Sequence, residues 1–427
     1  MRSLAAAVAA LALLVTPLAA HQLAAPPPAG AEAPALAVAF EGGLWFDGTG
    51  FVPARYYAVG GRFTARRPER IDATVNLRGR YLLPSLIEAH NHDMQNGFFG
   101  ARSNAKNMAL GIFHSVQMCS KPEDRAAFSG FLGQPGTVEV LYADACISGS
   151  DGHPLGIALA SARQAGMEVS AEEARRGYDP IDTLEELERV WPTILAREPK
   201  LIKFILINSQ RRSADLADPA TFGFRGLDPA LARPIVERAH AAGIRVVAHA
   251  DSAADFEIAL EAGVDMVAHL PGYRIAEGMS AADYRLSDRA IAQAARRGTV
   301  VITTAVAATH DMSRRPHNAE ALRAMQIENL TRLRAAGVPL AIGSDDVMGS
   351  VVDEILYLDG LAVMPRAELL RRATADTARA MFPERPIGRF AEGAEASFVA
   401  YDVDPLERLD VLRTPALRIQ RGAVLGP

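Results

Sequence analysis

Two histidines stand one residue apart behind an apolar run in the segment LPSLIEAHNHD, residues 83–93. If this run forms a strand, His90 and His92 point to the same side, because alternate residues of a strand share a face. Two buried imidazoles cost free energy unless each finds a partner. A cation is one such partner, since imidazole nitrogen is a good ligand for Zn²⁺ and similar metals. Hydrogen-bonded core histidines are the alternative.

Further residues that could bind a metal or exchange protons occur in or directly after other apolar runs. They are Lys203, His249, His269 and Asp345, with Asp346 beside the last. If the runs are barrel strands, these side chains meet at one end, and the metal interpretation is favoured. Burial lowers the pKa of a lysine, and its neutral amine could take up CO₂ to form a carbamate that bridges two metals. The alternative is a lysine whose ammonium reaches water.

The runs that carry these residues have the pattern of parallel strands buried on both faces. From Pro84 onward they are dense in Ile, Val and Leu without strict polar alternation. The eight segments are LIEAHNH, GIFHSVQM, VEVLYADA, LIKFILI, IRVVAHA, MVAHLP, VVITTAV and PLAIGSD. Helical patterns lie between them, so we predict an α/β fold, a (β/α)₈ TIM barrel over residues 84–384.

Two of the helical patterns are well defined. One covers residues 182–198, where Pro192 kinks or divides the helix. Its apolar stripe comprises Leu184, Leu187, Trp191, Ile194 and Leu195. The other begins at a cap, Ser287 or Asp288, and ends before Gly298.

The two flanks of the barrel differ from it. Residues 36–83 and 385–427 are rich in glycine, β-branched and aromatic residues, which indicates short strands with tight turns. We expect both segments to pair into a small composite β-sandwich domain that is built from both chain ends.

The N-terminus has the features of an export signal. Residues 1–20 contain one Arg, then an apolar run and small residues, which predicts a secretory signal peptide. A Pro/Ala-rich linker follows at residues 21–35. An N-terminal membrane anchor is the alternative, although the run is short for a span. We therefore expect a periplasmic or secreted protein, cleaved near Ala20, with no stable membrane insertion after cleavage.

Composition excludes several classes. The chain has 427 residues, 49% hydrophobic and 22% charged, as in a large globular protein. A net charge of −5 without a long basic run gives no reason to expect a nucleic-acid partner. Cys119 and Cys146 are too few for a disulfide scaffold, and the sequence leaves open whether they pair with each other. It also leaves open a homo-oligomer.

At the candidate metal ligands, the chain resembles the amidohydrolase superfamily. The resemblance is to its binuclear, carbamylated-lysine type, near the peptidase and imidazolonepropionase-like branch. The similarity runs from about Val38 to the C-terminus. It includes GGLWFDGTG, GRYLLPSLIEAHNHD, the lysine of the fourth strand, VVAHA, VAHLP, IGSD and PIGRFAEGAEASFVAYDVDPL.

The resemblance implies two divalent metal ions, with Zn²⁺ as the default. The implied ligands are His90, His92, carbamylated Lys203, His249, His269 and Asp345. The first two histidines and the aspartate would bind one metal. The other two histidines would bind the second metal, and the CO₂-derived carbamate on the lysine would bridge both. The ligand is assigned to Asp345 because it directly follows the GS turn, with Asp346 as the alternative.

The chain departs from the family motif at one segment, and it has further residues that could contact the substrate. The family's PGLID is PSLIE here, with Ser85 and Glu88, and we expect only local packing changes. The segment ISGSDGHPLG resembles a segment of peptidase-like members whose histidine contacts the substrate carbonyl, which implies that role for His153. An exposed loop histidine is the alternative. Tyr273 could also face the substrate, and His310 is a weaker candidate.

The resemblance therefore implies an exported metal-dependent hydrolase that cleaves a C–N amide bond. A metal-activated hydroxide would attack the carbonyl, with Asp345 as general base and acid. We expect a small-molecule amide as substrate, a dipeptide or an N-acyl amino acid, with Arg225 or Arg274 as candidates for binding its carboxylate. A cyclic amide or imide is one alternative, and a lactone, ester or phosphotriester another. A non-catalytic metal-binding barrel is the alternative of a different class.

Overall fold

The computed structural model describes residues 36–95, 97–130 and 132–426. The predicted signal peptide and Pro/Ala-rich linker lie outside the described residues. Leu36–Pro427 cluster as one compact unit, so the predicted boundaries at residues 83 and 384 stay predictions. Within the described ranges, no helix combines the length and the apolar character needed to span a bilayer.

The eight predicted strands are present and lie in two sheets in which every pairing is parallel. One sheet has the order β10-β9-β8, and the other has the order β12-β11-β13-β14-β15-β16-β17. The strands are β8 (Leu86–Asn91), β9 (Ile112–Gln117), β10 (Glu139–Tyr142), β11 (Ile147–Ser148), β12 (Asp179–Pro180), β13 (Leu201–Leu206), β14 (Arg245–Ala250), β15 (Met266–Ala268), β16 (Val300–Ile302) and β17 (Leu340–Ala341). The sequence did not predict β11 and β12, which have two residues each.

Two backbone hydrogen bonds connect these sheets. Ala89 N, in β8, donates to Ile342 O, directly after β17, at 3.1 Å. Asp144 N, after β10, donates to Leu201 O at the start of β13, also at 3.1 Å. The strands are therefore linked at both junctions between the two sheets, while closure into one continuous eight-stranded barrel stays a prediction.

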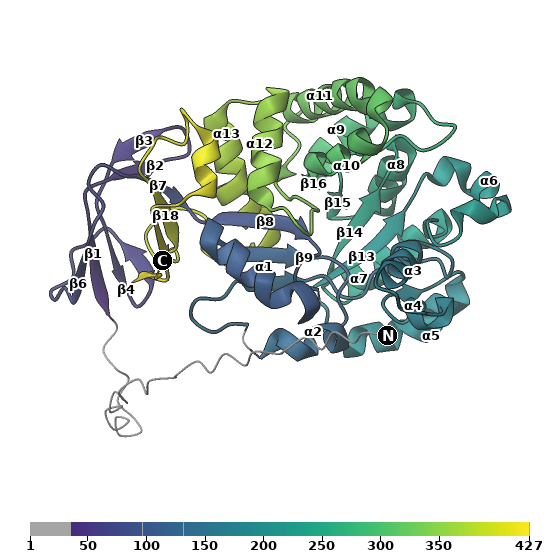
Figure 1. Cartoon of the computed structure of the whole chain (residues 1–427), viewed down its shortest axis with the longest axis horizontal. Helices are drawn as coiled ribbons and strands as arrows, with labels where there is room; N and C mark the ends of the chain where they lie inside the picture. The colour runs from purple at the N-terminus through teal and green to yellow at the C-terminus, as the bar shows by residue number, and fades with distance from the viewer. Residues whose placement is uncertain (1–35, 96, 131, 427) are drawn as a thin grey trace, which may run out of the picture. The chain divides into compact units, whose positions relative to one another are not determined.

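Helices pack on the outer side of the parallel strands, among them α8, α9 and α12 (Figure 1). The α-helices are α1 (Gly97–Leu110), α2 (Pro122–Ser129), α3 (Leu155–Gln164), α4 (Ala171–Arg175), α5 (Leu184–Ala196), α6 (Arg212–Ala217), α7 (Ala232–Ala241), α8 (Ala253–Ala262), α9 (Asp288–Arg297), α10 (Ala308–Arg314), α11 (Ala319–Ala335), α12 (Val351–Leu361), α13 (Arg366–Arg371) and α14 (Thr377–Met381). The predicted limits of α9 are confirmed, since Ser287 caps its start and Gly298 ends it with a φ of 67°.

The predicted apolar stripe of α5 is only partly correct. Leu187 and Ile194 are buried, and Pro192 lies inside one continuous helix. Leu184 and Leu195, however, are 44% and 37% exposed. They lie in the first and last turns of α5.

The two apolar layers of the strands have different roles. Leu86, Phe204 and Val246 belong to the large outer core between strands and helices. Leu201 and Val247 belong to a smaller inner core, enclosed by the strands. Alternate residues of one strand therefore serve two cores, which explains why these strands lack polar alternation.

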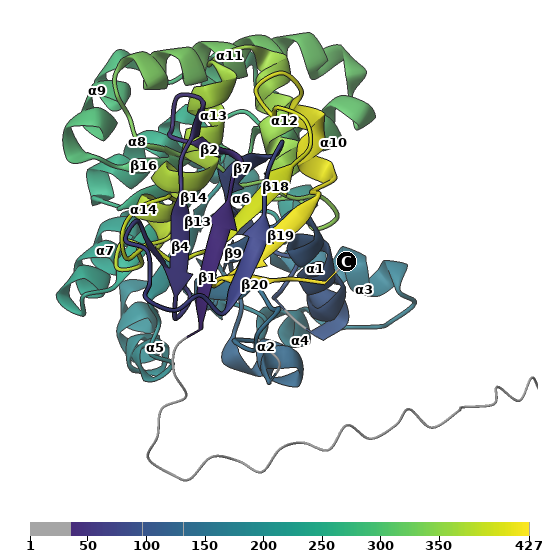
Figure 2. The same ribbon diagram turned by 90° about the vertical axis from the view of Figure 1, so that its left-hand side faces the viewer.

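The flanking segments form two further sheets, with orders β5-β4-β1-β6 and β20-β19-β18-β7-β2-β3. Their strands are β1 (Ala37–Glu41), β2 (Leu44–Phe46), β3 (Phe51–Pro53), β4 (Tyr56–Val59), β5 (Arg62–Thr64), β6 (Ala73–Asn76), β7 (Tyr81–Pro84), β18 (Phe398–Tyr401), β19 (Leu417–Gln420) and β20 (Ala423–Val424). The second sheet joins both ends of the chain, because β18 pairs with β7 (Figure 2). Phe40, Trp45, Phe63 and Phe398 pack together in a core shared by the two sheets.

Cys119 and Cys146 form a disulfide, which answers the question that the sequence left open. Their Cα atoms lie 4.6 Å apart. Cys119 follows β9 and Cys146 precedes β11, so the bond links the two parallel sheets.

This disulfide predicts a measurable stabilisation. It closes a loop with a sequence separation of 27, and loops of this length constrain the unfolded chain by about 3.5 kcal/mol. We expect Cys146→Ala to lower the free energy of unfolding in urea by that amount. Wild-type protein unfolded in the presence of reductant is the control and should match the variant. Equal stability of oxidised and reduced wild type would contradict the prediction.

Candidate metal centre

Lys203 and His249 lie on the inner side of neighbouring strands, where Lys203 pairs with Val247 and His249 pairs with Ile205. Lys203 is two residues after Leu201 in β13, and His249 is two residues after Val247 in β14, so all four share the inner side. Lys203 is 2% and His249 5% exposed. On the inner side of these strands, the apolar residues Leu201 and Val247 are thus followed by the polar side chains Lys203 and His249.

His90 and His92 point into the same space from the end of β8. The β8–β9 register shifts between Glu88 and Asn91, and such an irregularity re-aims side chains. His90 Nε2 lies 3.3 Å from His92 Nε2 and 3.3 Å from Lys203 Nζ. His90 and His92 thus lie beside Lys203, the lysine of the fourth predicted strand.

His269 and Asp345 reach the site through unusual backbone conformations. Strict alternation after Ala268 would turn the next side chain outward, but His269 has a φ of 80°. Asp345, with a φ of 50°, lies four residues after the end of β17. Left-handed conformations of such residues cost free energy and concentrate at functional sites. The backbone N of Asp345 donates to His90 O at 2.8 Å, and this hydrogen bond fixes Asp345 beside β8.

Asp345 is the centre of the first group of candidate ligands. Its Oδ1 lies 3.2 Å from His92 Nε2 and 3.4 Å from His90 Nε2, and its Oδ2 lies 3.6 Å from His269 Nδ1. His90, His92 and Asp345 offer ligand atoms that all lie within 4.8 Å of one another. The carboxylate of Asp346 instead accepts a hydrogen bond from Met348 N. The geometry therefore favours Asp345 over its neighbour.

The second predicted group is more open. The ring centroids of His249 and His269 lie 4.4 Å apart, and those of His90 and His269 lie 4.7 Å apart. Lys203 lies between the two groups, in contact with His90. The resemblance assigns two histidines, His249 and His269, to the predicted second metal position, and the predicted carbamate on Lys203 would complete it.

Burial sets the protonation of these residues. It lowers the pKa of His90 and His269 well below the ordinary value, so both imidazoles are neutral. It also lowers the pKa of Lys203 to about 8, which leaves part of the amine uncharged near neutral pH. Burial opposes ionisation of Asp345, but the adjacent His90 and His92 overcome it and hold the pKa of Asp345 well below the ordinary value. The site thus combines neutral imidazoles, a reactive amine and a carboxylate.

One unpaired nitrogen shows how these residues fit a metal. His269 Nε2 is buried without a hydrogen-bond partner, whereas His90 directs Nε2 at Lys203 and Asp345 and leaves only its other nitrogen, Nδ1, without a partner. The other nitrogen of His269 is held by Thr304 Oγ1 at 2.8 Å. A neutral ring whose one nitrogen is held and whose other is bare is the arrangement in which histidine binds metals.

A second group of histidine and acids suits a metal less well. His114 is buried, with Nε2 3.7 Å from Glu395 and 3.9 Å from Glu139. Arg385 and Arg421 each contact both carboxylates. Two guanidinium groups already balance the two negative charges, so a further cation would be repelled.

Glu88 does more than change the local packing, which was all that we expected of it. Its Oε1 accepts hydrogen bonds from Ser344 N at 2.8 Å and His90 N at 3.1 Å, and its Oε2 accepts one from Ser344 Oγ at 2.8 Å. Burial raises the pKa of Glu88 to about 8. This carboxyl group clamps the segment that carries Asp345 to β8.

Asp251 is a residue of the site that sequence reasoning missed. It lies two residues after His249, is 1% exposed and accepts from His249 Nε2 at 2.7 Å. Tyr273 OH and the Arg274 guanidinium also donate to it. Burial opposes ionisation, but Arg274 and the hydrogen bonds hold the pKa of Asp251 well below the ordinary value. The signal in the sequence was the spacing of an acid two residues after a candidate ligand.

The two predicted substrate residues lie beside the histidines. The His153 ring stacks on His249 at a centroid distance of 5.7 Å, and the Tyr273 ring lies 5.2 Å from that of His269. His153 is therefore not an isolated loop residue. His310, the weaker candidate, is exposed and reaches only Asp346, at 3.9 Å.

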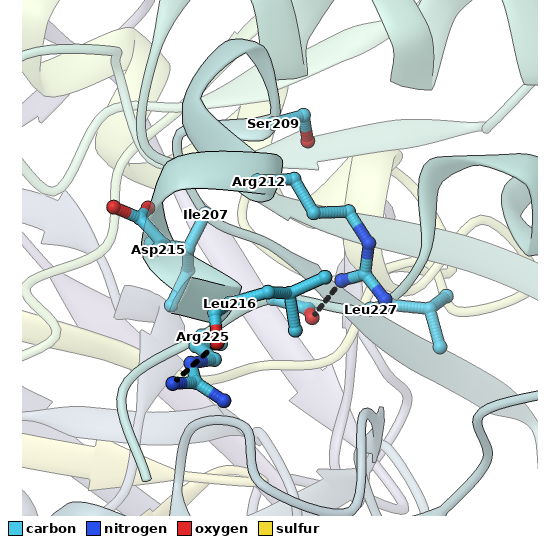
Figure 3. Close-up of a pocket in the computed structure, with 8 residues that line it drawn as sticks. Ile207, Ser209, Arg212, Asp215, Leu216, Arg225 and Leu227 are labelled. Atoms are coloured by element: carbon cyan, nitrogen blue, oxygen red, sulfur yellow. Dashed lines mark hydrogen bonds between the residues drawn. The ribbon is translucent and has the colours of Figure 1, made fainter. Parts of the chain in front are cut away.

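The structure separates the two arginines that could bind a carboxylate. Arg225 is held by Asp151 and by Thr221 Oγ1. It lines a small pocket formed by residues around α6 (Figure 3), and none of the candidate metal ligands lines that pocket. Arg274 uses Nε and Nη2 on one oxygen of Asp251, at 3.1 and 2.6 Å, and is one-third exposed. Of the two, Arg274 is the one beside the site.

Comparison with known sequences identifies relatives of this chain. The model of the amidohydrolase family matches residues 180–414. An ochratoxinase from Aspergillus niger is 24% identical over 359 residues, which cover 78% of this chain and 72% of the relative. An imidazolonepropionase from Chromobacterium violaceum is 28% identical over 211 residues, 46% of this chain and 45% of the relative. An uncharacterized protein from Mycobacterium tuberculosis is 28% identical over 203 residues, 45% of this chain and half the length of that relative.

Solved structures share the fold. A Xaa-Pro dipeptidase with bound methionine superposes with a TM-score of 0.70 at 16% identity and covers 92% of this chain and 100% of its own. The A. niger ochratoxinase has a TM-score of 0.70 at 19% identity and covers 92% of this chain and 96% of its own. At these identities the similarity establishes the fold alone.

The contact between β8 and the segment after β17 yields a prediction. A Cβ on Gly343 would lie 2.6 Å from His90 N and 2.9 Å from His90 Cβ, too close for any real contact. We expect Gly343→Ala to lower the free energy of unfolding by about 1–3 kcal/mol and to weaken zinc binding, because Asp345 moves away from β8.

Gly360, in α12, is the matched control because no atom lies within 4 Å of the added Cβ. Gly360→Ala should raise stability by roughly 0.5–1 kcal/mol and leave zinc affinity unchanged. Thermal unfolding and zinc titration measure both effects. Similar behaviour of the two variants would contradict the role of this contact.

Proposed function

The chain belongs to the amidohydrolase family, and from this premise we propose that it is an enzyme that hydrolyses carbon–nitrogen bonds of amides. The observation that carries the proposal is the convergence of His90, Lys203, His269 and Asp345 within a few ångströms at one end of the parallel strands. A purely structural interior seldom gathers so many titratable groups with shifted pKa values in one place.

The scaffold that we propose for this site is a closed (β/α)₈ barrel with a composite β-sandwich domain. The two hydrogen bonds that connect the parallel sheets support closure. The sheet that joins β7 with β18 supports the composite domain. Sites on such barrels lie at the carboxyl ends of the strands, which is where the candidate ligands are found.

We assign two divalent ions, Zn²⁺ by default, to this site. His90, His92 and Asp345 would hold one of them, and His249 and His269 the other. Lys203, as a carbamate, would bridge them, and its partly neutral amine near pH 8 supports uptake of CO₂. Such a metal pair lowers the pKa of a bound water and polarises a carbonyl.

In the proposed hydrolysis, Asp345 acts as the general base and then as the general acid. Its low pKa keeps it ionised at neutral pH, so it can accept a proton from the attacking water. The same proton then passes to the leaving nitrogen. Glu88 and the bond from Asp345 N to His90 O hold the carboxylate in place during both steps.

His153 and Tyr273 are the proposed contacts to the substrate. Burial and the neighbouring His249 lower the pKa of His153 well below the ordinary value, so it is neutral and can donate one N–H to a carbonyl oxygen. Burial and Asp251 raise the pKa of Tyr273 well above the ordinary value, so its phenol keeps its proton. Donors of this kind stabilise the oxyanion of acyl transfer.

A dipeptide or an N-acyl amino acid is the proposed substrate. Arg274 supports it, because this guanidinium lies beside the site and its Nη1 is not used in the contact with Asp251. The structural likeness to a Xaa-Pro dipeptidase points the same way. Cyclic amides or imides are the alternative, followed by lactones and phosphotriesters.

Export to the periplasm or the medium completes the proposal. The N-terminal segment has the composition of a signal peptide. The disulfide between Cys119 and Cys146 supports an oxidising compartment, because such bonds rarely persist in the cytosol.

A substrate screen combined with one variant tests this function. The zinc-loaded protein, assayed against a dipeptide library with hydantoins and lactones as controls, should release amino acids, and a chelator should abolish the reaction. Asp345→Asn should retain most of the metal yet lower kcat by about 10³-fold, because an amide cannot accept the proton. Asp346→Asn is the matched control and should stay near wild type. Equal rates of Asp345→Asn and wild type would refute the assignment of the base.

A further inference from the structure

Asp251 is a buried carboxylate that contacts three other polar side chains of the site. Its Oδ2 accepts from Arg274 Nε and Nη2 at 3.1 and 2.6 Å. Its Oδ1 faces His249 Nε2 at 2.7 Å and accepts from Tyr273 OH. One carboxylate therefore joins a candidate metal ligand, a candidate substrate contact and the arginine of the same rim.

The directions of these hydrogen bonds are fixed by the donors. A guanidinium has only N–H donors, so both of its bonds to Asp251 require an accepting oxygen. Tyr273 OH also donates to Asp251. With three donors around it, the carboxylate has no proton to give to His249, and the 2.7 Å contact must be an N–H of His249 donating to Oδ1.

This direction determines the tautomer of His249. An imidazole that binds a cation is neutral and carries one N–H. If that N–H is on Nε2, the unshared pair is on Nδ1. Thr304 holds His269 by the opposite nitrogen, Nδ1, and leaves Nε2 bare. The two histidines of the second metal position would thus bind through different nitrogens.

We propose that Asp251 is a positioning residue of the metal centre: it holds His249 protonated on Nε2, with Nδ1 as the ligand atom, and holds the Tyr273 phenol beside it. Arg274 supports this arrangement, because its Nε and Nη2 both donate to Oδ2 and leave Oδ1 to accept from His249 and Tyr273. The inference rests on the proposed function for its meaning, since it assigns His249 to a metal.

Nitrogen NMR of histidine-labelled, metal-free protein at pH 8 reads the tautomer directly. The His249 signals are identified by their loss in His249→Gln. In wild type we expect a protonated Nε2 and a bare Nδ1. In Asp251→Asn, whose amide can also donate, we expect a shift toward protonated Nδ1. A wild-type His249 that carries its proton on Nδ1 overturns the inference, whatever the variant does.

Zinc affinity provides the second readout. Loss of such an outer partner typically weakens metal binding 10–100-fold, so Asp251→Asn should show a fall of about that size in a competition titration with a chelator. Affinity within twofold of wild type would overturn the inference. Both readouts are independent of turnover, so failure to hydrolyse any amide would count against the proposed function only.

The chain offers a matched control in a second histidine–aspartate pair. His240 Nε2 lies 2.9 Å from Asp265 Oδ2, on the outer side of the strands and away from the candidate ligands. Asp265→Asn should change the tautomer of His240 but leave zinc affinity as in wild type. A comparable loss of zinc affinity in this control would show a general effect of removing an acid, and would overturn the specific role of Asp251.

Discussion

The cost of burying imidazoles, an amine and a carboxylate in one small space is the constraint on which the rest of the structure depends. His90, Lys203 and His269 are at most 2% exposed, and two of their ring nitrogens have no hydrogen-bond partner. Groups in this state cost several kcal/mol when nothing compensates them. A bound cation would compensate this cost, because the imidazoles and the carboxylate would become its ligands. The cost of these buried groups is therefore what makes them candidates for a metal centre.

Hydrogen bonds from residues around the site hold the candidate ligands in place. Glu88 ties the segment of Asp345 to β8, Thr304 holds His269, and Asp251 holds His249. Each support fixes the direction of a ligand rather than contributing one. The left-handed backbone at His269 and Asp345 is part of the same arrangement, since packing around the strand ends must maintain these strained conformations.

Much of this arrangement was predictable from the sequence. Continuous apolar runs such as LIKFILI predicted strands buried on both faces, and all eight of them are strands. The convergence of Lys203, His249 and His90 followed from the rule that barrel strands end at one rim. The resemblance of the motifs added the role of Asp345, which the geometry favours over Asp346.

The remainder depends on contacts that a single sequence does not encode locally. β11 and β12 have two residues each and no apolar period. Leu184 and Leu195 have helical spacing, but they lie in the terminal turns of α5 and are exposed. Asp251 was missed because its function arises from Tyr273 and Arg274, more than twenty positions away. Glu88 acts through Ser344, which is even more distant in the chain.

Anomalous diffraction at the zinc edge from crystals of the zinc-loaded protein tests the central claim most directly. The account predicts two peaks, each about 2.1 Å from its imidazole ligands. One would lie among His90, His92 and Asp345 and the other beside His249 and His269, with extended density on Lys203 between them. No peak among these side chains, or one peak with an unmodified lysine, would contradict it.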